Sequence, residues 1–67
     1  MDNPVKDKNY AMISSIYHLS QGSEMSKQYA QDAQRDGDNN AAEFFNELHR
    51  VYTEHGEKGA KILKERL

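Results

Sequence analysis

The sequence predicts an all-α protein, an antiparallel two-helix hairpin that dimerises into a four-helix bundle. Two segments of matched length carry apolar residues at helical spacing, and a short glycine turn separates them. With 67 residues and no cysteine, the chain has room for one small domain and no disulfide to stabilise it. Oligomerisation, or a metal held by histidines and carboxylates, remains as the means of stabilisation.

The first helical segment is predicted over about residues 9–36. One row of residues recurs at alternating intervals of four and three, which is typical of a helix that contacts another helix. Ile13 widens this row near its start. The preceding residues 1–8, around Pro4, are predicted to form a flexible polar arm. The row begins with large apolar residues and ends with small ones: Met12, Ile16, Leu19, Ser23, Ser26, Ala30 and Ala33.

The stretch of residues 35–40, Arg-Asp-Gly-Asp-Asn-Asn, predicts a tight turn. Gly37 suits the left-handed conformation just past a helix end. Either Asp38 or Asn40 then caps the next helix, and Asn40 with Glu43 three residues later resembles a capping box. Because the connection is short, the two helices are expected to be antiparallel neighbours.

The second helix is predicted over about residues 39–66, with acidic residues near its start and basic residues near its end, as the helix dipole favours. Its predicted contact row is Ala41, Phe45, Leu48, Tyr52, His55, Gly59 and Ile62. Two such helices cover only one face of each other, so a homodimer is expected to cover the rest. The predicted core and interface positions are Ile13, Ile16, Leu19, Phe44, Phe45, Leu48, Val51, Tyr52 and Ile62.

Charge and hydropathy exclude two classes of partner. The net charge is −2 with no block of basic residues, which argues against nucleic-acid binding. No stretch approaches the roughly 20 apolar residues of a membrane span, and no charged start leads into an apolar signal core. We therefore expect a soluble cytoplasmic protein with no nucleic-acid or membrane partner.

Few residues suggest chemistry. The serines and histidines form no recognisable nucleophile–base–acid set, and the glycines form no phosphate-binding loop, so no enzyme activity and no cofactor are predicted. His55 lies on the predicted contact row, and its ring is expected to point into the bundle. There it is either a metal ligand or a core histidine bonded to a hydroxyl group. His49 and His18 are expected at the surface.

Four stretches between residues 29 and 63 resemble a rubrerythrin-type ferritin-like helix pair. They are Tyr29-Ala30-Gln31-Asp32-Ala33, Asp36-Gly37, Ala42-Glu43-Phe44-Phe45-Asn46-Glu47 and Glu54-His55-Gly56-Glu57-Lys58. The resemblance implies half of a four-helix bundle that binds two irons through a glutamate on the first helix and a glutamate-x-x-histidine on the second. Those glutamates correspond to Leu19 and Tyr52 here, and only His55 keeps a ligand. The resemblance therefore implies the fold and the dimer, and it argues against oxidase or peroxidase activity.

Three functions follow from these observations. The leading interpretation is a small non-enzymatic interaction or structural module, a ferritin-like half-bundle without a complete di-iron site. The second is a dimeric ferritin-like protein that binds iron or a similar metal through His55 of each subunit with Glu24 or Glu47. The third is a small regulatory protein that binds another protein through an exposed aromatic flank.

Overall fold

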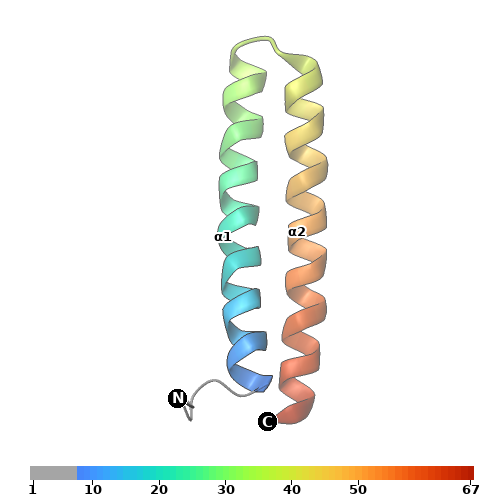
Figure 1. Cartoon of the computed structure of the whole chain (residues 1–67). Helices are drawn as coiled ribbons and strands as arrows, with labels where there is room; N and C mark the ends of the chain where they lie inside the picture. Colours follow the sequence, from blue (N-terminus) through green and yellow to red (C-terminus); the bar gives the residue numbers. More distant parts are fainter. Residues whose placement is uncertain (1–7) are drawn as a thin grey trace.

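The computed structural model describes residues 8–67, and there the chain forms two α-helices joined by a short turn (Figure 1). Helix α1 spans Lys8–Arg35 and helix α2 spans Asn39–Arg66, each 28 residues long. They lie side by side and antiparallel, so the end of α2 returns to the start of α1. The predicted all-α hairpin is confirmed. The predicted arm, residues 1–8, lies outside the described residues except for Lys8, which begins α1.

The turn ends α1 and begins α2 through backbone and side-chain hydrogen bonds. Gly37 adopts φ 77°, the left-handed conformation predicted for it. The Gly37 amide donates to the Gln34 carbonyl at 3.1 Å and the Asp38 amide to the Ala33 carbonyl at 2.9 Å, which is the Schellman pattern. The Asp38 carboxylate then accepts from the Ala41 amide at 3.1 Å. Of the two predicted caps, Asp38 is therefore the one used.

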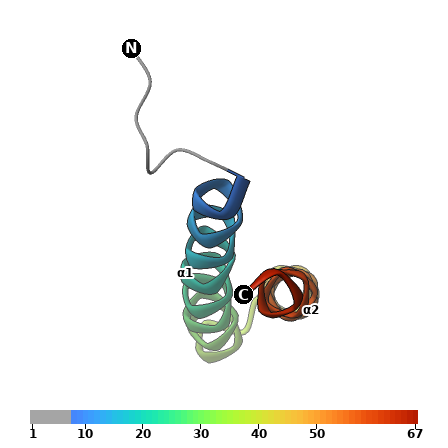
Figure 2. The same ribbon diagram turned by 90° about the horizontal axis from the view of Figure 1, so that it is seen from below.

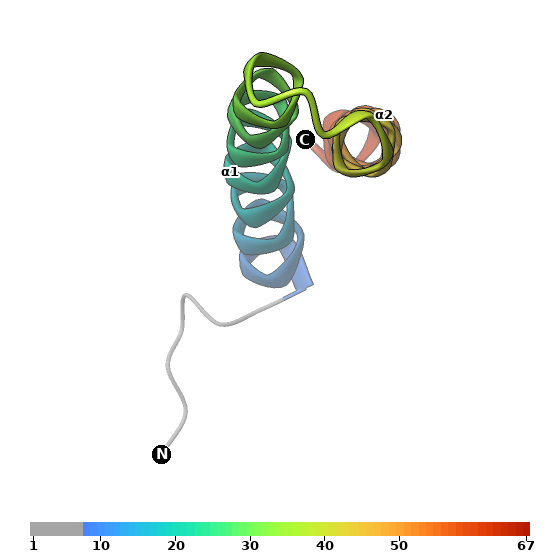
Figure 3. The same ribbon diagram turned by 90° about the horizontal axis from the view of Figure 1, so that it is seen from above.

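The hairpin is only one helix thick. Its principal extents are 49 × 26 × 12 Å, and the shortest is about the diameter of a single helix. Viewed along α2 from either end, α1 is inclined to it, so the two helices cross at an angle (Figures 2 and 3). Because domains usually consist of two or more packed layers, both broad sides of this single layer lack the cover that a second layer provides.

The contact row of α1 agrees with the sequence prediction. Its first four members are half-buried and its last three, Ser26, Ala30 and Ala33, are buried. Gly22 also lies in this contact, where a Cβ atom would come within 2.9 Å of the Tyr52 ring. Small residues therefore allow α2 to approach α1 closely along much of its length.

The predicted contact row of α2 is wrong at His55 and Ile62, which are exposed. Ala41 and Leu48 are half-buried beside residues of α1, and the residues that follow these four positions also belong to the contact. The reason is size: a close approach to the small residues of α1 requires small side chains opposite, and Ala42 and Gly56 provide them. The observed row is Ala42, Phe45, His49, Tyr52, Gly56, Gly59 and Leu63.

The interior of the hairpin contains few apolar atoms. Among residues 8–67, the buried apolar residues are Ala30, Ala33 and Ala42, with Ser26 as the buried polar residue. No large side chain in this part of the chain is fully buried. The larger residues of the two contact rows are half-buried, and most of the other large residues lie outside the contact.

Candidate interaction surface

One broad side of the hairpin carries large apolar residues from both helices. A shallow hollow of about 230 Å³ is lined by Met25 and Tyr29 of α1 together with Phe45, Leu48 and Tyr52 of α2. From Leu48, repeated helical spacing extends the same side of α2 to Phe44 in one direction and through Val51 and His55 to Ile62 in the other. We define the apolar face as Met25, Tyr29, Phe44, Leu48, Val51 and Ile62.

Most of the apolar face is accessible in the single hairpin. Phe44 is 59% exposed, Met25 51%, and Tyr29 and Val51 45% each. Leu48 is half-buried. Large exposed apolar patches usually mark interaction sites, whereas scattered single residues do not. The members of this set follow α2 over most of its length, so they form a patch.

An aromatic cluster stiffens the apolar face near the turn. The Tyr29 ring packs edge-on against Phe45 with ring centres 5.4 Å apart. Phe44 packs against the same Phe45 ring at 5.2 Å, also edge-on. Edge-to-face pairs at these separations are favourable, so the three rings are held in place before any partner binds.

The opposite side of the hairpin combines polar and apolar residues. One hollow there is lined by Ser20, Glu24, Thr53 and Glu57 together with Ile16, Tyr52 and Ala60. A second hollow, nearer the turn, is lined by Gln34, Asn46, Arg50 and other polar residues. Apolar residues are found on this side near the start of α1, since helical spacing places Ile13 and Tyr17 in the row that continues to Ser20.

A polar cluster joins the two helices at mid-height. The Thr53 hydroxyl donates to the His49 carbonyl at 2.8 Å, and it lies 2.8 Å from the Ser23 hydroxyl. Because the Thr53 hydrogen is used, the Ser23 hydroxyl donates to Thr53. His49 Nδ1 lies 3.0 Å from Ser23 Oγ and 2.9 Å from the Ser23 carbonyl oxygen. With the Ser23 hydrogen also used, His49 must carry its proton on Nδ1.

Two of the three histidines, His49 and His55, occupy different environments from those expected. His49 is half-buried and bonded to a hydroxyl group, so its predicted surface position is wrong. His18 is exposed, as predicted. His55 is exposed on the flank of α2, where its Nδ1 lies 3.3 Å from the Val51 carbonyl oxygen of the preceding turn. In the sequence, the feature that could have identified His49 as the buried histidine is the presence of two hydroxyl residues that reach it, Ser23 and Thr53.

The three positions that the predicted resemblance assigns to iron ligands, Leu19, Tyr52 and His55, do not lie together in the hairpin. Leu19 lies opposite Gly56, and the Tyr52 ring lies against Gly22, both in the contact between the helices. His55 lies outside that contact. Within residues 8–67, no three or more histidine, aspartate or glutamate side chains are gathered in a way that would hold a metal ion.

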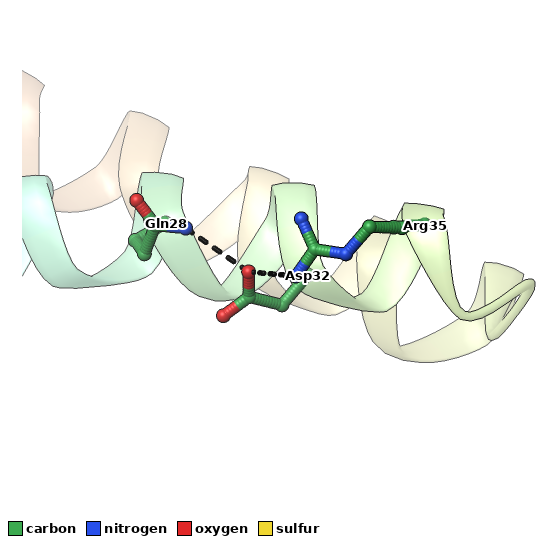
Figure 4. Close-up of polar contacts among 3 residues, drawn as sticks. All are labelled: Gln28, Asp32 and Arg35. Atoms are coloured by element: carbon green, nitrogen blue, oxygen red, sulfur yellow. Dashed lines mark hydrogen bonds and ion pairs between the residues drawn. The ribbon is translucent and has the colours of Figure 1, made fainter.

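A charged contact close to the turn is internal to α1. Asp32 accepts hydrogen bonds from Gln28 at 3.0 Å and from Arg35 at 2.7 Å (Figure 4). These two hydrogen bonds, and the charge of Arg35, hold the pKa of the Asp32 carboxyl below its ordinary value. Asp32 is therefore already paired within its own helix.

The assignment of this protein as a two-helix hairpin rests on its own sequence and structure. In comparisons with known proteins, no family model, curated protein or solved structure matches the chain. As for membrane insertion, neither helix has the combination of length and apolar character needed to span a bilayer within the described part of the chain.

Proposed function

We propose that this chain is a non-enzymatic structural or interaction module whose apolar face pairs with the same face of a second copy. The observation that carries the proposal is the distribution of side-chain size. The interior of the hairpin holds alanines and a serine, while Phe44, Val51 and Ile62 are each more than two-fifths exposed. Two hairpins stacked on these faces form the four-helix bundle that the sequence predicts.

The energetics of burial support pairing. Burying a valine-, leucine- or phenylalanine-sized side chain completely contributes about 1.5–3 kcal/mol, whereas alanine contributes much less. In a single hairpin the large side chains are at best half-buried, so most of this contribution is missing. A second copy covers the patch on both subunits at once, because a two-fold interface is self-complementary.

If the hairpin is a ferritin-like half-bundle, as we propose from the resemblance, the residue types at Leu19 and Tyr52 argue against the iron chemistry of that family. An oxygen-rich di-iron site needs carboxylates at these two positions. Leucine and tyrosine supply none, and both residues here lie opposite glycines of the neighbouring helix. In the proposed dimer the corresponding positions stabilise the bundle by packing.

The proposal is tested by the mass in solution of a matched pair of variants. Val51→Glu puts a charge on the apolar face, and Tyr17→Glu puts the same charge on the row that includes Ser20. Both residues are exposed in the hairpin, at 45% and 59%, so neither substitution disturbs the helix–helix contact. We expect Val51→Glu to be monomeric and Tyr17→Glu to remain dimeric by sedimentation equilibrium. A dimer of Val51→Glu with unchanged affinity would refute pairing through this face.

A second candidate function, binding to a different protein, is favoured by the apolar residues outside the proposed interface. Ile13 is 54% exposed and Tyr17 is 59% exposed, and helical spacing places them on the side away from Phe44 and Val51. A dimer formed through the apolar face leaves this pair accessible. Loss of binding in Tyr17→Glu, with the dimer intact, would distinguish such a partner from the second copy.

A further inference from the structure

We infer that the two copies pair antiparallel, with helix α2 of one lying on α2 of the other and the two turns at opposite ends of the bundle. The inference rests on the proposed function, since it concerns the same apolar face. Two hairpins can stack face to face about a two-fold axis in only two ways. Either the turns lie at opposite ends and like helices stack on one another, or the turns lie at the same end and α1 stacks on α2 of the partner.

The charges along the outer flank of α2 separate these two arrangements. Glu47, Val51, Glu54 and Lys58 follow one another at intervals of four, three and four, so they lie in one row along the outer edge of α2. This edge separates the apolar face from the polar hollow near the turn, which Glu47 also lines. Lys61 continues the row. Its half near the turn is thus acidic and its half near the C-terminus is basic. All four charged residues are exposed.

Antiparallel stacking of α2 on its copy brings opposite charges together. Helix α2 spans Asn39–Arg66, and Glu47 and Lys58 each lie eight residues inside opposite ends of it. When the two copies of α2 overlap fully, Glu47 of each therefore lies level with Lys58 of the other, and this happens twice per dimer. Lys61 lies less than one turn beyond each pair. Glu54 of each copy lies level with Val51 of the other, so the two Glu54 residues are three positions apart near the midpoint, and each has Lys58 one turn away on its own helix.

The alternative arrangement leaves the same charges without partners. The contacts of Leu19 with Gly56 and of Gly22 with Tyr52 fix which residues of α1 and α2 are level. With the turns at the same end, those levels also hold between α1 and α2 of different copies. Glu47 of one copy then lies at the same height along the bundle as Gln28 of the other, and Glu43 lies at the same height as Asp32 of the other.

The outer flank of α1 carries no lysine or arginine that could pair with the acidic residues of α2. Its row is Ser14, His18, Gln21, Met25, Gln28 and Asp32, again at intervals of four and three. Its one carboxylate, Asp32, already accepts hydrogen bonds from Gln28 and Arg35 (Figure 4). An approaching Glu43 would therefore meet a like charge. In the antiparallel arrangement this nearly uncharged row stacks on its own copy, which costs no repulsion.

Distances between spin labels decide the arrangement directly, because the chain has no cysteine and single labels can be attached cleanly. Asn40→Cys labels the turn end of α2, and Gln21→Cys labels the middle of α1; both positions are exposed. In the antiparallel dimer we expect about 40 Å between the two Asn40→Cys labels, the length of the helix, and a short distance between the Gln21→Cys labels. Short distances for both would overturn the antiparallel inference and leave the dimer intact. No distance for either, with a monomeric mass, would refute the dimer itself.

A charge exchange gives an independent readout. Glu47→Lys and Lys58→Glu each place like charges opposite one another in the antiparallel dimer, and we expect each to weaken dimerisation about tenfold at low salt. The double variant restores the opposite charges and is expected to recover most of the affinity. Glu57→Lys, on the other side of the hairpin, is the control and should leave affinity unchanged. A double variant weaker than both single variants would contradict the antiparallel pairing.

Discussion

At the scale of single residues, two of the four glycines allow a close approach between the helices. A Cβ atom built at Gly22 would lie 2.9 Å from Cε2 and 3.0 Å from Cδ2 of the Tyr52 ring. At Gly59 the corresponding distance is 2.9 Å to Cγ1 of Ile16. At Gly56 the nearest such atom is Cβ of Leu19 at 3.9 Å, an ordinary contact. Glycine at position 22 therefore has a packing role that offsets its low helix propensity.

These distances predict opposite effects for two otherwise identical substitutions. Gly22→Ala is expected to lower the free energy of unfolding by about 1–3 kcal/mol, because the Tyr52 ring must move. Gly56→Ala is expected to raise it by up to about 1 kcal/mol through helix propensity alone. Urea denaturation followed by circular dichroism measures both. Stabilisation by Gly22→Ala would contradict the close contact with Tyr52.

The cluster of Ser23, His49 and Thr53 predicts the tautomer of a neutral histidine. Since both hydroxyl hydrogens are used within the cluster, Nδ1 of His49 carries the proton and Nε2 does not. Nitrogen-15 chemical shifts of the imidazole rings distinguish the two tautomers. We expect the Nδ1–H form for neutral His49, and a predominant Nε2–H form would contradict the network. His18, which is exposed, is the internal comparison.

Some of these residue-level contacts were beyond sequence reasoning. Spacing alone identified the row of α1, because small residues there alternate cleanly with polar ones. On α2, two neighbouring rows both contain apolar residues, one through Phe45 and Tyr52 and the other through Leu48 and Ile62. The spacing alone did not separate them, so the predicted contact row contained members of both. Which row meets α1 depends on how closely the backbones approach, and that is set by small residues such as Ala42 and Gly56 on both helices. For this reason the sequence placed His55 in the contact and His49 at the surface, whereas the structure has His49 half-buried and His55 exposed.

At the scale of secondary-structure elements, the turn is the best-determined part of the chain. Gly37 and Asp38 carry it through the left-handed conformation and the N-cap that their residue types favour. Both signals are local, which is why the sequence predicted the turn well. The sequence left Asp38 and Asn40 open as the cap, and the structure shows Asp38 as the cap because Asn40 already lies inside α2.

A matched pair of substitutions tests that cap. Asp38→Ala removes the carboxylate that accepts from the Ala41 amide and is expected to cost about 0.5–2 kcal/mol. Asn40→Ala replaces a residue already inside α2 and is expected to be neutral or slightly stabilising. Thermal unfolding measures the difference. Equal losses from both variants would mean that the cap is shared.

The contribution of Asp32, near the end of α1, to the stability of the folded chain is predicted to depend on pH. Hydrogen bonds from Gln28 and Arg35 lower the pKa of Asp32, so the charged carboxylate is favoured in the helix over the unfolded chain. This contribution is present above the unfolded-state pKa and is lost as the pH falls through the lowered folded-state pKa. NMR titration of Gln28→Ala is expected to show the Asp32 pKa rising toward its ordinary value. An unchanged pKa would assign the effect to Arg35 alone.

At the scale of the whole molecule, the hairpin is a single layer with one apolar side. The small residues between the helices bring them close together, and several of the larger residues, such as Phe44 and Val51, lie on the side that the proposed second copy covers. The sequence predicted the two-helix architecture because periodicity and the turn are local features. It could not assign Ile13 and Phe44 to different sides, since that depends on the direction in which α2 leaves the turn.

The most direct test of pairing is the mass of the native chain in solution, measured by light scattering over a range of concentrations. Samples stripped of metal and samples supplemented with iron are compared. We predict a dimer of about twice the 7.7 kDa chain mass in both, because packing of the apolar face requires no metal. A monomer at all concentrations, or a dimer that forms only with iron, would contradict the account.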